Sequence, residues 1–477
     1  MAMEEGGEMG DFCSGYLVVN PEEATILDLL RLLCSGADGE GRGFIDCSPE
    51  KKKLVLEDFW GRWLIFVSIL AQKVLQLCKK PMAQIGSLLE LWLNLLSSNG
   101  GTLPKLLLNI LRGKVVIPDR GSATFSSVIG NLDERVELDR RIRWYDHGDR
   151  MRYEASLAVM AAKLSYENEA FIRTVVTDHW EMTFLGSYNF WNDYQEKLST
   201  QAFMFKDTKA DPELIVVAFR GTSPFDADDW QVDADVSWLE LEGVGKMHAG
   251  FMKALGMQKG RGWPKEIAQE GERAYAYYAI RQKLRETMEK EERARFVVTG
   301  HSLGGALALL FAGILVLHEE REMLERLEGV YTFGQPRAGD EQFGLFMEEK
   351  FRGHNVRYFR YVYCNDMVPR LPYDGKALFY KHFGECLYYN SCYQGKIVGE
   401  EPDKNYFSMW WAIPKSLNAL WELSRSFIIP YMEGPDYKEG WFLRLFRVIG
   451  LFIPGLSAHS PQDYVNSTRL GYLPSTL

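Results

Sequence analysis

One stretch near the middle of the chain constrains the fold more than any other feature. Residues 296–305 read Phe-Val-Val-Thr-Gly-His-Ser-Leu-Gly-Gly, and an alanine- and leucine-rich segment follows. The β-branched residues predict a short strand, Gly-x-Ser-x-Gly predicts a sharp turn, and the remainder predicts a helix. Ser302 would then stand on a strained turn with its hydroxyl clear of the backbone. Gly300 and Gly304 leave room where a β-carbon would collide.

Composition places the chain among ordinary globular proteins, with 46% hydrophobic and 25% charged residues in a total of 477. The net charge is −10 and no long basic block occurs, which argues against a nucleic-acid partner. Seven scattered cysteines and an acidic start without a signal-peptide pattern favour a reducing, cytosol-facing location. The spacing of His382, Cys386 and Cys392 fits no common zinc pattern, so we expect no metal there.

The first part of the chain divides into an acidic segment, 1–59, and an apolar region, 60–117. Lys79, Lys80 and Pro81 are expected to break the apolar region, and no uninterrupted run reaches the roughly 18–20 residues of a spanning helix. Tryptophan and lysine flanks suit a membrane interface. One interpretation is a monotopic hairpin or an interfacial helix pair. The other is a set of amphipathic helices packed on the rest of the protein.

The remainder, 118–477, predicts an α/β domain with a largely parallel sheet, because strand and helix patterns alternate along it. The expected strands are 214–220, 296–300, 330–334 and 356–363, and the expected helices are 264–292, 304–325 and 340–352. Such sheets carry their sites at the C-terminal ends of the strands.

A serine nucleophile needs a base, and the base needs an orienting carboxylate. In α/β-hydrolases these follow in the order Ser, Asp or Glu, His. Asp366 comes directly after the strand 356–363, so it is the candidate acid. His459 lies in a late loop before helix-start signals and is the favoured base. His382, only 16 residues after Asp366, is the alternative base.

Two other histidines that follow Ser302 are poor candidates for the base. His318 lies on the helix that follows the elbow, more than four turns from the serine. His354 precedes a strand, which places it at the opposite edge of the sheet.

Two backbone amides are candidates for an oxyanion hole. Leu303 opens the helix after the elbow, where amides point at developing negative charge. Thr222 follows the strand 214–220 in Phe-Arg-Gly-Thr-Ser-Pro, where the second donor of this fold is expected. Its amide, with its hydroxyl as a further candidate, would face the charge beside Leu303.

Five ordered motifs resemble those of class 3 (fungal-type) lipases. The resemblance covers roughly 200–375 and resumes near His459, and the whole chain is most similar to plant oil-body lipases. The motifs are Phe-Arg-Gly-Thr at 219–222, Met-His-Ala-Gly-Phe at 247–251, Gly-His-Ser-Leu-Gly-Gly-Ala-Leu-Ala at 300–308, Phe-Gly-Gln-Pro-Arg-Ala-Gly-Asp at 333–340 and Asn-Asp-Met-Val-Pro-Arg-Leu-Pro at 365–372.

The resemblance implies an α/β-hydrolase fold and assigns roles to residues that match its motifs. Ser302, Asp366 and His459 would form the triad, Thr222 and Leu303 the oxyanion hole, and Asp233 would orient the oxyanion-hole hydroxyl. His301, with Gly300 and Gly304, belongs to the elbow motif. Residues 223–230 fall where the family carries its lid. The acidic cluster Asp226, Asp228, Asp229, Asp233 and Asp235 is interpreted as a solvated lid hinge rather than a calcium site.

The implied activity is hydrolysis of triacylglycerol, and also of di- and monoacylglycerols, on the cytosol-facing monolayer of lipid droplets, without metal or cofactor. The alternatives are a phospholipase A1 or galactolipase of the same fold, or a catalytically silent droplet scaffold. The chain departs from the family in the 92 residues between Asp366 and His459. The apolar insert at about 400–456 is read as a second lipid-facing or acyl-binding surface, or as extra core.

Overall fold

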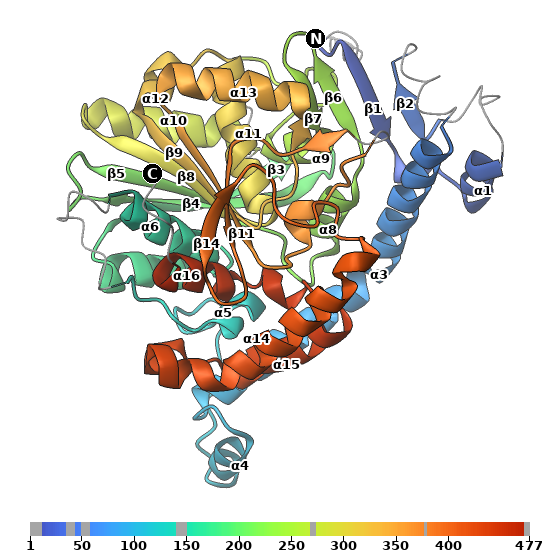
Figure 1. Ribbon diagram of the computed structural model, residues 1–477. Coiled ribbons are helices and arrows are strands. Elements are labelled where there is room, and N and C mark those ends of the chain that lie inside the picture. Colours follow the sequence, from blue (N-terminus) through green and yellow to red (C-terminus); the bar gives the residue numbers. More distant parts are fainter. Residues whose placement is uncertain are drawn as a thin grey trace.

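A central eight-stranded sheet organises the computed structural model, which describes residues 12–34, 43–48, 58–139, 150–267, 273–375 and 379–471 (Figure 1). Its strands β5, β8, β9, β11 and β13 are parallel, and pairs that involve β3, β4 or β14 are antiparallel. The order across the sheet is β14 (Gly395–Val398), β13 (Glu385–Tyr389), β11 (Arg357–Tyr363), β9 (Leu327–Phe333), β8 (Arg295–His301), β5 (Leu214–Phe219), β4 (Lys197–Asp207) and β3 (Thr183–Asn192).

Helices cover both faces of this sheet and bury two apolar clusters. Successive residues of β5 alternate between them: Ile215 and Val217 join one cluster, whereas Val216 and Ala218 join the other. The first face is covered by α9 (Ala249–Leu255), α10 (Ala276–Lys290), α11 (Leu303–Leu317) and α13 (Glu341–His354), and the second by α6 (Arg150–Leu164) and α16 (Pro461–Leu470). The predicted α/β class with a largely parallel sheet is confirmed.

Further short helices complete the fold, and one helix predicted from the sequence is split into two. The expected helix 304–325 is interrupted after α11, and a separate α12 follows. The further short helices are α4 (Leu103–Leu111), α5 (Val128–Leu132), α7 (Glu169–Thr174), α8 (Ala227–Ala234) and α12 (Arg321–Arg326).

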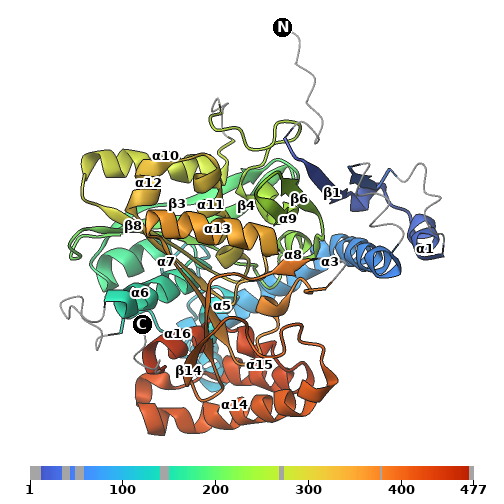
Figure 2. The ribbon, with the colours of Figure 1, turned by 45° about the horizontal axis from the view of Figure 1, so that its top comes forward.

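A second, antiparallel sheet joins the N-terminal part of the chain to the α/β region. Tyr16 pairs with Leu239, and Leu29 and Leu32 pack on Ile65 in a small apolar cluster. Figure 2 shows β1 and α1 (Ile26–Cys34) beside α3. The described part of the segment 1–59 is therefore built into the fold, while the acidic residues 1–11 lie outside the described residues. The sheet order is β12 (Tyr380–Lys381), β10 (Gly339–Asp340), β7 (Gly245–His248), β6 (Trp238–Leu241), β1 (Gly15–Val19) and β2 (Ile45–Cys47).

Most of the apolar region forms one helix, α3 (Phe59–Ser98), of 40 residues, and the shorter α4 follows it. The predicted break at 79–81 is wrong, because the helix continues through an exposed Pro81. Proline removes one helical N–H, but Lys79 and Gly86 on either side of it contact α8 and the loop before it. These contacts hold the helix against α8 on both sides of the proline. By length and composition alone α3 could cross a membrane, although 33% of its most apolar window is buried against the protein.

The two long sides of α3 differ in their surroundings. The side toward the protein buries Ile65, Ile69 and Leu93, among others. The opposite side exposes large apolar residues at alternating intervals of three and four, apart from one gap near Pro81. We call this set the outer stripe; it comprises Trp60, Trp63, Val67, Leu70, Val74, Leu77, Ile85, Leu88 and Trp92.

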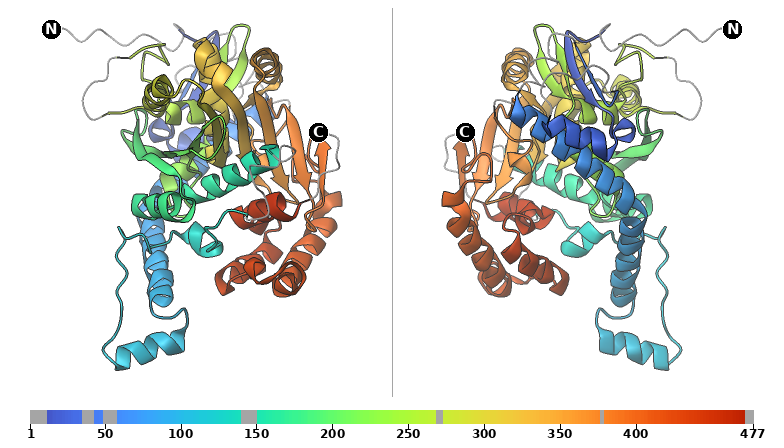
Figure 3. Two further views of the ribbon diagram at one scale, coloured as in Figure 1. Left: turned by 90° about the vertical axis from the view of Figure 1, so that its left-hand side faces the viewer. Right: turned by 90° about the vertical axis from the view of Figure 1, so that its right-hand side faces the viewer.

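The insert folds into two antiparallel helices, α14 (Ala412–Glu433) and α15 (Trp441–Phe452). A buried ionic cluster joins them to α16. Arg447 donates to Glu439 over 2.6 Å and to Asp463 over 3.1 Å, and Arg425 donates to Asp463 over 2.9 Å. Figure 3 shows this helix pair and the α3–α4 region at the same end of the molecule.

Candidate active site

The elbow forms as the sequence predicts. β8 ends at His301, α11 begins at Leu303, and Ser302 between them has φ 58° and ψ −132°. A non-glycine residue at such angles is strained and needs support, which the Ser302 amide receives by donating to the Phe333 carbonyl over 2.9 Å. A β-carbon at Gly300 would lie 2.1 Å from the backbone of Gly304, so only glycine fits there.

The structure brings the serine, the favoured histidine and the candidate acid into one hydrogen-bonded row. His459 Nε2 lies 2.8 Å from Ser302 Oγ, and His459 Nδ1 lies 2.7 Å from Asp366 Oδ2. His459 comes from a 3-10 turn that lies between α15 and α16, and Asp366 follows β11. Asp366 is fully buried, and Ser302 is 6% exposed. This row has the connectivity of an acyl-transfer triad.

Tyr464 is a contact of the acid that sequence reasoning missed. Its hydroxyl donates to the Asp366 carboxylate, and the Val368 amide donates to the other oxygen over 2.9 Å. Tyr464 lies on α16, five residues after His459, so a tyrosine at this spacing was the available signal. Burial raises the pKa of Tyr464 well above its usual range, so this hydroxyl stays a donor.

His301, next to the nucleophile, has a supporting position. Tyr166 OH lies 2.8 Å from its Nδ1, and the His459 carbonyl lies 3.0 Å from its Nε2. Burial holds the pKa of His301 well below its usual range. The neutral His301 ring thus supports the backbone of His459, whose side chain faces Ser302.

Thr222 lies on the loop that leaves β5, and α8 holds this loop. The Thr222 hydroxyl donates to Asp233 Oδ2 over 2.6 Å. Asp229, one turn earlier on α8, accepts from the Ser223 amide and from Arg220, each over 2.9 Å. Withdrawal from water raises the pKa of Asp233 to about 7 and that of Asp229 to about 6. The side chain of Thr222 is therefore occupied by Asp233, and its amide is the group left to face an oxyanion.

His382, the alternative base, is not brought to the nucleophile. Its Nε2 lies 2.7 Å from the Pro369 carbonyl, and burial holds its pKa well below the usual range. The structure therefore places His459, and not His382, beside Ser302.

The acidic cluster does not converge on one point. Asp226 caps α8, Asp228 pairs with Lys79, and Asp235 pairs with Lys253. Asp229 and Asp235 are buried, so the interpretation of a solvated hinge is wrong for them. Among the described residues, no group of three or more His, Cys, Asp or Glu side chains is arranged to hold a metal ion.

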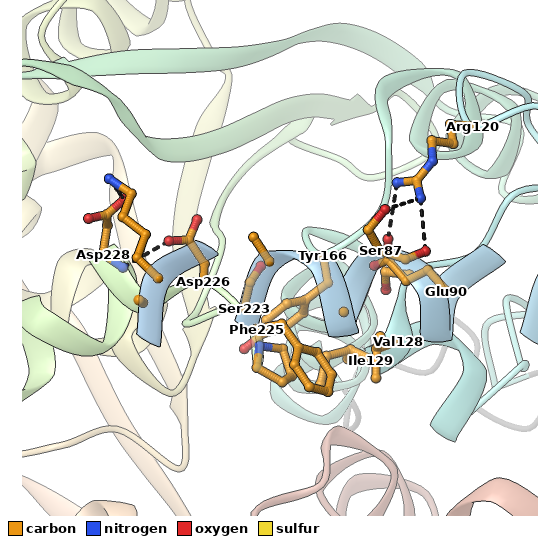
Figure 4. Close-up of a pocket in the computed structure, with 16 residues that line it drawn as sticks. Ser87, Glu90, Arg120, Val128, Ile129, Tyr166, Ser223, Phe225, Asp226 and Asp228 are labelled. Carbon is orange, nitrogen blue, oxygen red and sulfur yellow. Dashed lines mark hydrogen bonds and ion pairs between the residues drawn. The ribbon is translucent and has the colours of Figure 1, made fainter. Parts of the chain in front are cut away.

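A cavity of about 400 Å³ lies between α3, α5 and the predicted lid segment 223–230 (Figure 4). Ser87, Glu90 and Arg120 line one end, where Arg120 donates to Ser87 and pairs with Glu90. Phe225 and Tyr166 line the middle. The predicted lid thus faces α3 across a hollow whose inner wall is the tyrosine that contacts His301.

Known proteins resemble this chain along almost its whole length. A family model described as Lipase (class 3) matches residues 216–376. "Triacylglycerol lipase OBL1" of Nicotiana tabacum is 42% identical over 97% of this chain and 96% of its own length. The Arabidopsis thaliana protein of that name is 45% identical over 96% of this chain and 95% of its own. The chain belongs to the class 3 lipase family. Among solved structures, the native Rhizomucor miehei lipase propeptide complex is 23% identical, with a TM-score of 0.37 over 51% of this chain and 69% of that chain.

In this class 3 lipase, the family match includes Thr222, Ser302 and Asp366 but ends before His459. The position of His459 beside Ser302 is therefore seen in the tertiary structure and not in the family match. The insert before it, α14 and α15, also lies outside the matched range.

Proposed function

We propose that this class 3 lipase hydrolyses triacylglycerol at the surface of lipid droplets, with Ser302 as nucleophile. The observation that carries the proposal is the row of hydrogen bonds from Asp366 through His459 to Ser302. Nearly full-length similarity to relatives named triacylglycerol lipase supports the substrate class.

The first half-reaction transfers the acyl group to the enzyme. His459 Nε2 takes the hydroxyl proton of Ser302 while Oγ bonds to the ester carbonyl carbon. Asp366 accepts from Nδ1–H and stabilises the imidazolium. The tetrahedral intermediate collapses when His459 gives the proton to the glycerol oxygen, the old C–O bond breaks, and diacylglycerol leaves. Water then repeats the sequence on the acyl-enzyme and releases a fatty acid.

The oxyanion of each intermediate is stabilised by two amides. Leu303 is the first residue of α11, where backbone N–H groups have no acceptor within the helix. The Thr222 amide is the second donor, held in place through its side chain by Asp233. Removal of one such donor typically costs about 3–4 kcal/mol in the transition state. All groups that the reaction needs are side chains or amides of this chain, without metal or cofactor.

The substrate class is tested by comparing fatty-acid release from emulsified triolein, phosphatidylcholine vesicles and a galactolipid dispersion. We expect triolein to be hydrolysed at least about tenfold faster than either polar lipid, with Ser302→Ala as the blank. A preference for phosphatidylcholine or galactolipid would assign the enzyme to phospholipases A1 or galactolipases. An inert wild type that a serine-directed phosphonate fails to label would make it a droplet scaffold.

Attachment to the lipid monolayer is supported by two exposed apolar surfaces. The first is the outer stripe of α3, together with α4, where Leu111 is 84% exposed. The second lies on α14, the 3-10 turn before it and α15, where Trp410, Tyr431 and Phe452 are each more than 80% exposed. Contiguous apolar surface of this kind marks an interaction site, and an insoluble substrate makes a lipid phase the natural partner.

Replacing Leu77 and Leu88 of the outer stripe with glutamine is expected to weaken binding to oil droplets by roughly a hundredfold or more. Each leucine contributes about 1.5–3 kcal/mol when it leaves water. Flotation with triolein droplets coated with phosphatidylcholine measures the loss. Both side chains are exposed, so the thermal midpoint should stay unchanged. Full retention on droplets would show that α14 and α15, and not the outer stripe, attach the protein.

A further inference from the structure

Helix α8 acts as the support of the oxyanion loop. Two carboxylates one helical turn apart bind consecutive groups of that loop: Asp233 accepts from the Thr222 hydroxyl, and Asp229 accepts from the Ser223 amide. Asp229 also pairs with Arg220 at the end of β5. A displacement of α8 would therefore move the Thr222 amide relative to Ser302.

Three residues of α3 in turn contact α8 or the loop just before it. Ser68 Oγ donates to the last carbonyl of α8 over 2.6 Å. Lys79 Nζ lies 2.9 Å from Asp228 Oδ2 on the first turn of α8. Gly86 lies against Phe225, just before α8, so closely that a β-carbon would be 2.4 Å from that of Phe225. These contacts cover both ends of α8 and the loop ahead of it.

All three contact residues lie on the side of α3 that faces away from the outer stripe. Ser68, Lys79 and Gly86 are separated by 11 and 7 residues, close to whole numbers of helical turns. The stripe residues Leu77 and Leu88 are exposed on the other side. One helix thus has separate sides for the protein and for an external apolar partner.

We propose that α3 is a positioning element of the catalytic centre: through Ser68, Lys79 and Gly86 it holds α8, and thereby Asp233 and the oxyanion amide of Thr222, in place. The inference rests on the proposed acyl transfer at Ser302. It gives α3 a second role, positioning the oxyanion loop, in addition to the proposed binding of lipid by its outer stripe. Removal of α3 would then impair the chemistry itself as well as attachment to droplets.

The test uses Gly86→Ala in the full-length protein with the water-soluble ester 4-nitrophenyl butyrate. The new methyl group meets the Cβ and Cγ of Phe225, which cannot move without the backbone of the loop before α8. A misplacement of about 1 Å in a catalytic group can cost up to about a hundredfold. We expect kcat to fall roughly 10- to 100-fold with KM unchanged, because the lost interaction is made only in the transition state.

Controls separate positioning from stability. Alanine raises helix propensity over glycine, so a mere helix effect would raise the thermal midpoint and leave kcat unchanged. Gln84→Ala, two residues away on an exposed position of α3, should leave kcat unchanged. In a protein that already carries Asp233→Ala, Gly86→Ala should lower kcat by less than a further threefold, because both changes act through Thr222. An unchanged kcat for Gly86→Ala, or an undiminished loss in that background, would overturn the proposal.

Hydrogen–deuterium exchange gives a readout that does not depend on activity. The Ser223 amide is bonded to Asp229, so Gly86→Ala should speed exchange in a peptide covering 219–226, whereas Gln84→Ala should not. Unchanged exchange would contradict the proposal even if the wild type proved inert. An inert wild type with the expected change in exchange would instead refute only the proposed function.

Discussion

His459→Ala is expected to lower kcat on both triolein and 4-nitrophenyl butyrate by roughly four to six orders of magnitude. His459 Nε2, 2.8 Å from Ser302 Oγ, is the acceptor for the serine proton. Without it the hydroxyl has no base, and Asp366 at 2.7 Å from Nδ1 has no ring to orient. Single-turnover release of 4-nitrophenol measures the acylation step directly.

His382→Ala is the matched comparison, because both histidines follow Asp366 in the chain. The His382 ring contacts the Pro369 carbonyl and is half-buried. Its removal should cost about 1–3 kcal/mol of stability and less than tenfold in kcat. Retained activity in His459→Ala with loss in His382→Ala would reverse the assignment of the base.

Arg447→Met is expected to lower the free energy of unfolding by about 3–5 kcal/mol. Arg447 is fully buried and bonded to Glu439 and Asp463, with Glu422 at 3.6 Å. Methionine fills a similar volume but removes one cation from these carboxylates. Arg425, which pairs with Asp463, remains. Burial and the charge of Asp463 already raise the pKa of Glu422 to about 7, which shows how little further negative charge this site tolerates. Chemical denaturation monitored by tryptophan fluorescence measures the change.

Arg444→Met, one turn earlier on α15, is the control for this prediction. Arg444 is only half-buried; it donates to the Ser426 carbonyl and lies over the Phe427 ring. Its loss should cost less than about 1 kcal/mol. Equal effects of the two substitutions would show that the buried ionic cluster does not anchor the insert. Because Asp463 precedes Tyr464, we also expect Arg447→Met to disturb the support of Asp366.

The α/β class, the elbow and the candidate acid were predictable because they depend on short-range patterns. The strand 296–300, the turn at Ser302 and the following helix are consecutive in the chain, and Asp366 directly follows a strand. The predicted break at Pro81 was wrong because the course of the chain there depends on long-range contacts. Local propensity favours a helix end there, but α3 is held on α8 by contacts with residues more than 130 positions away.

The sequence by itself determined that a serine stands on a strand-to-helix elbow and that an aspartate follows a later strand. It also determined that one apolar segment precedes the domain and another lies within it. Only the tertiary structure decided which histidine meets the serine, because His459 lies 157 residues from it. The same holds for Tyr464 on Asp366, for the ionic cluster that ties the insert to α16, and for α3 behind α8. In each case the deciding quantity is a distance of about 3 Å between side chains from separate elements, which periodicity and propensity do not encode.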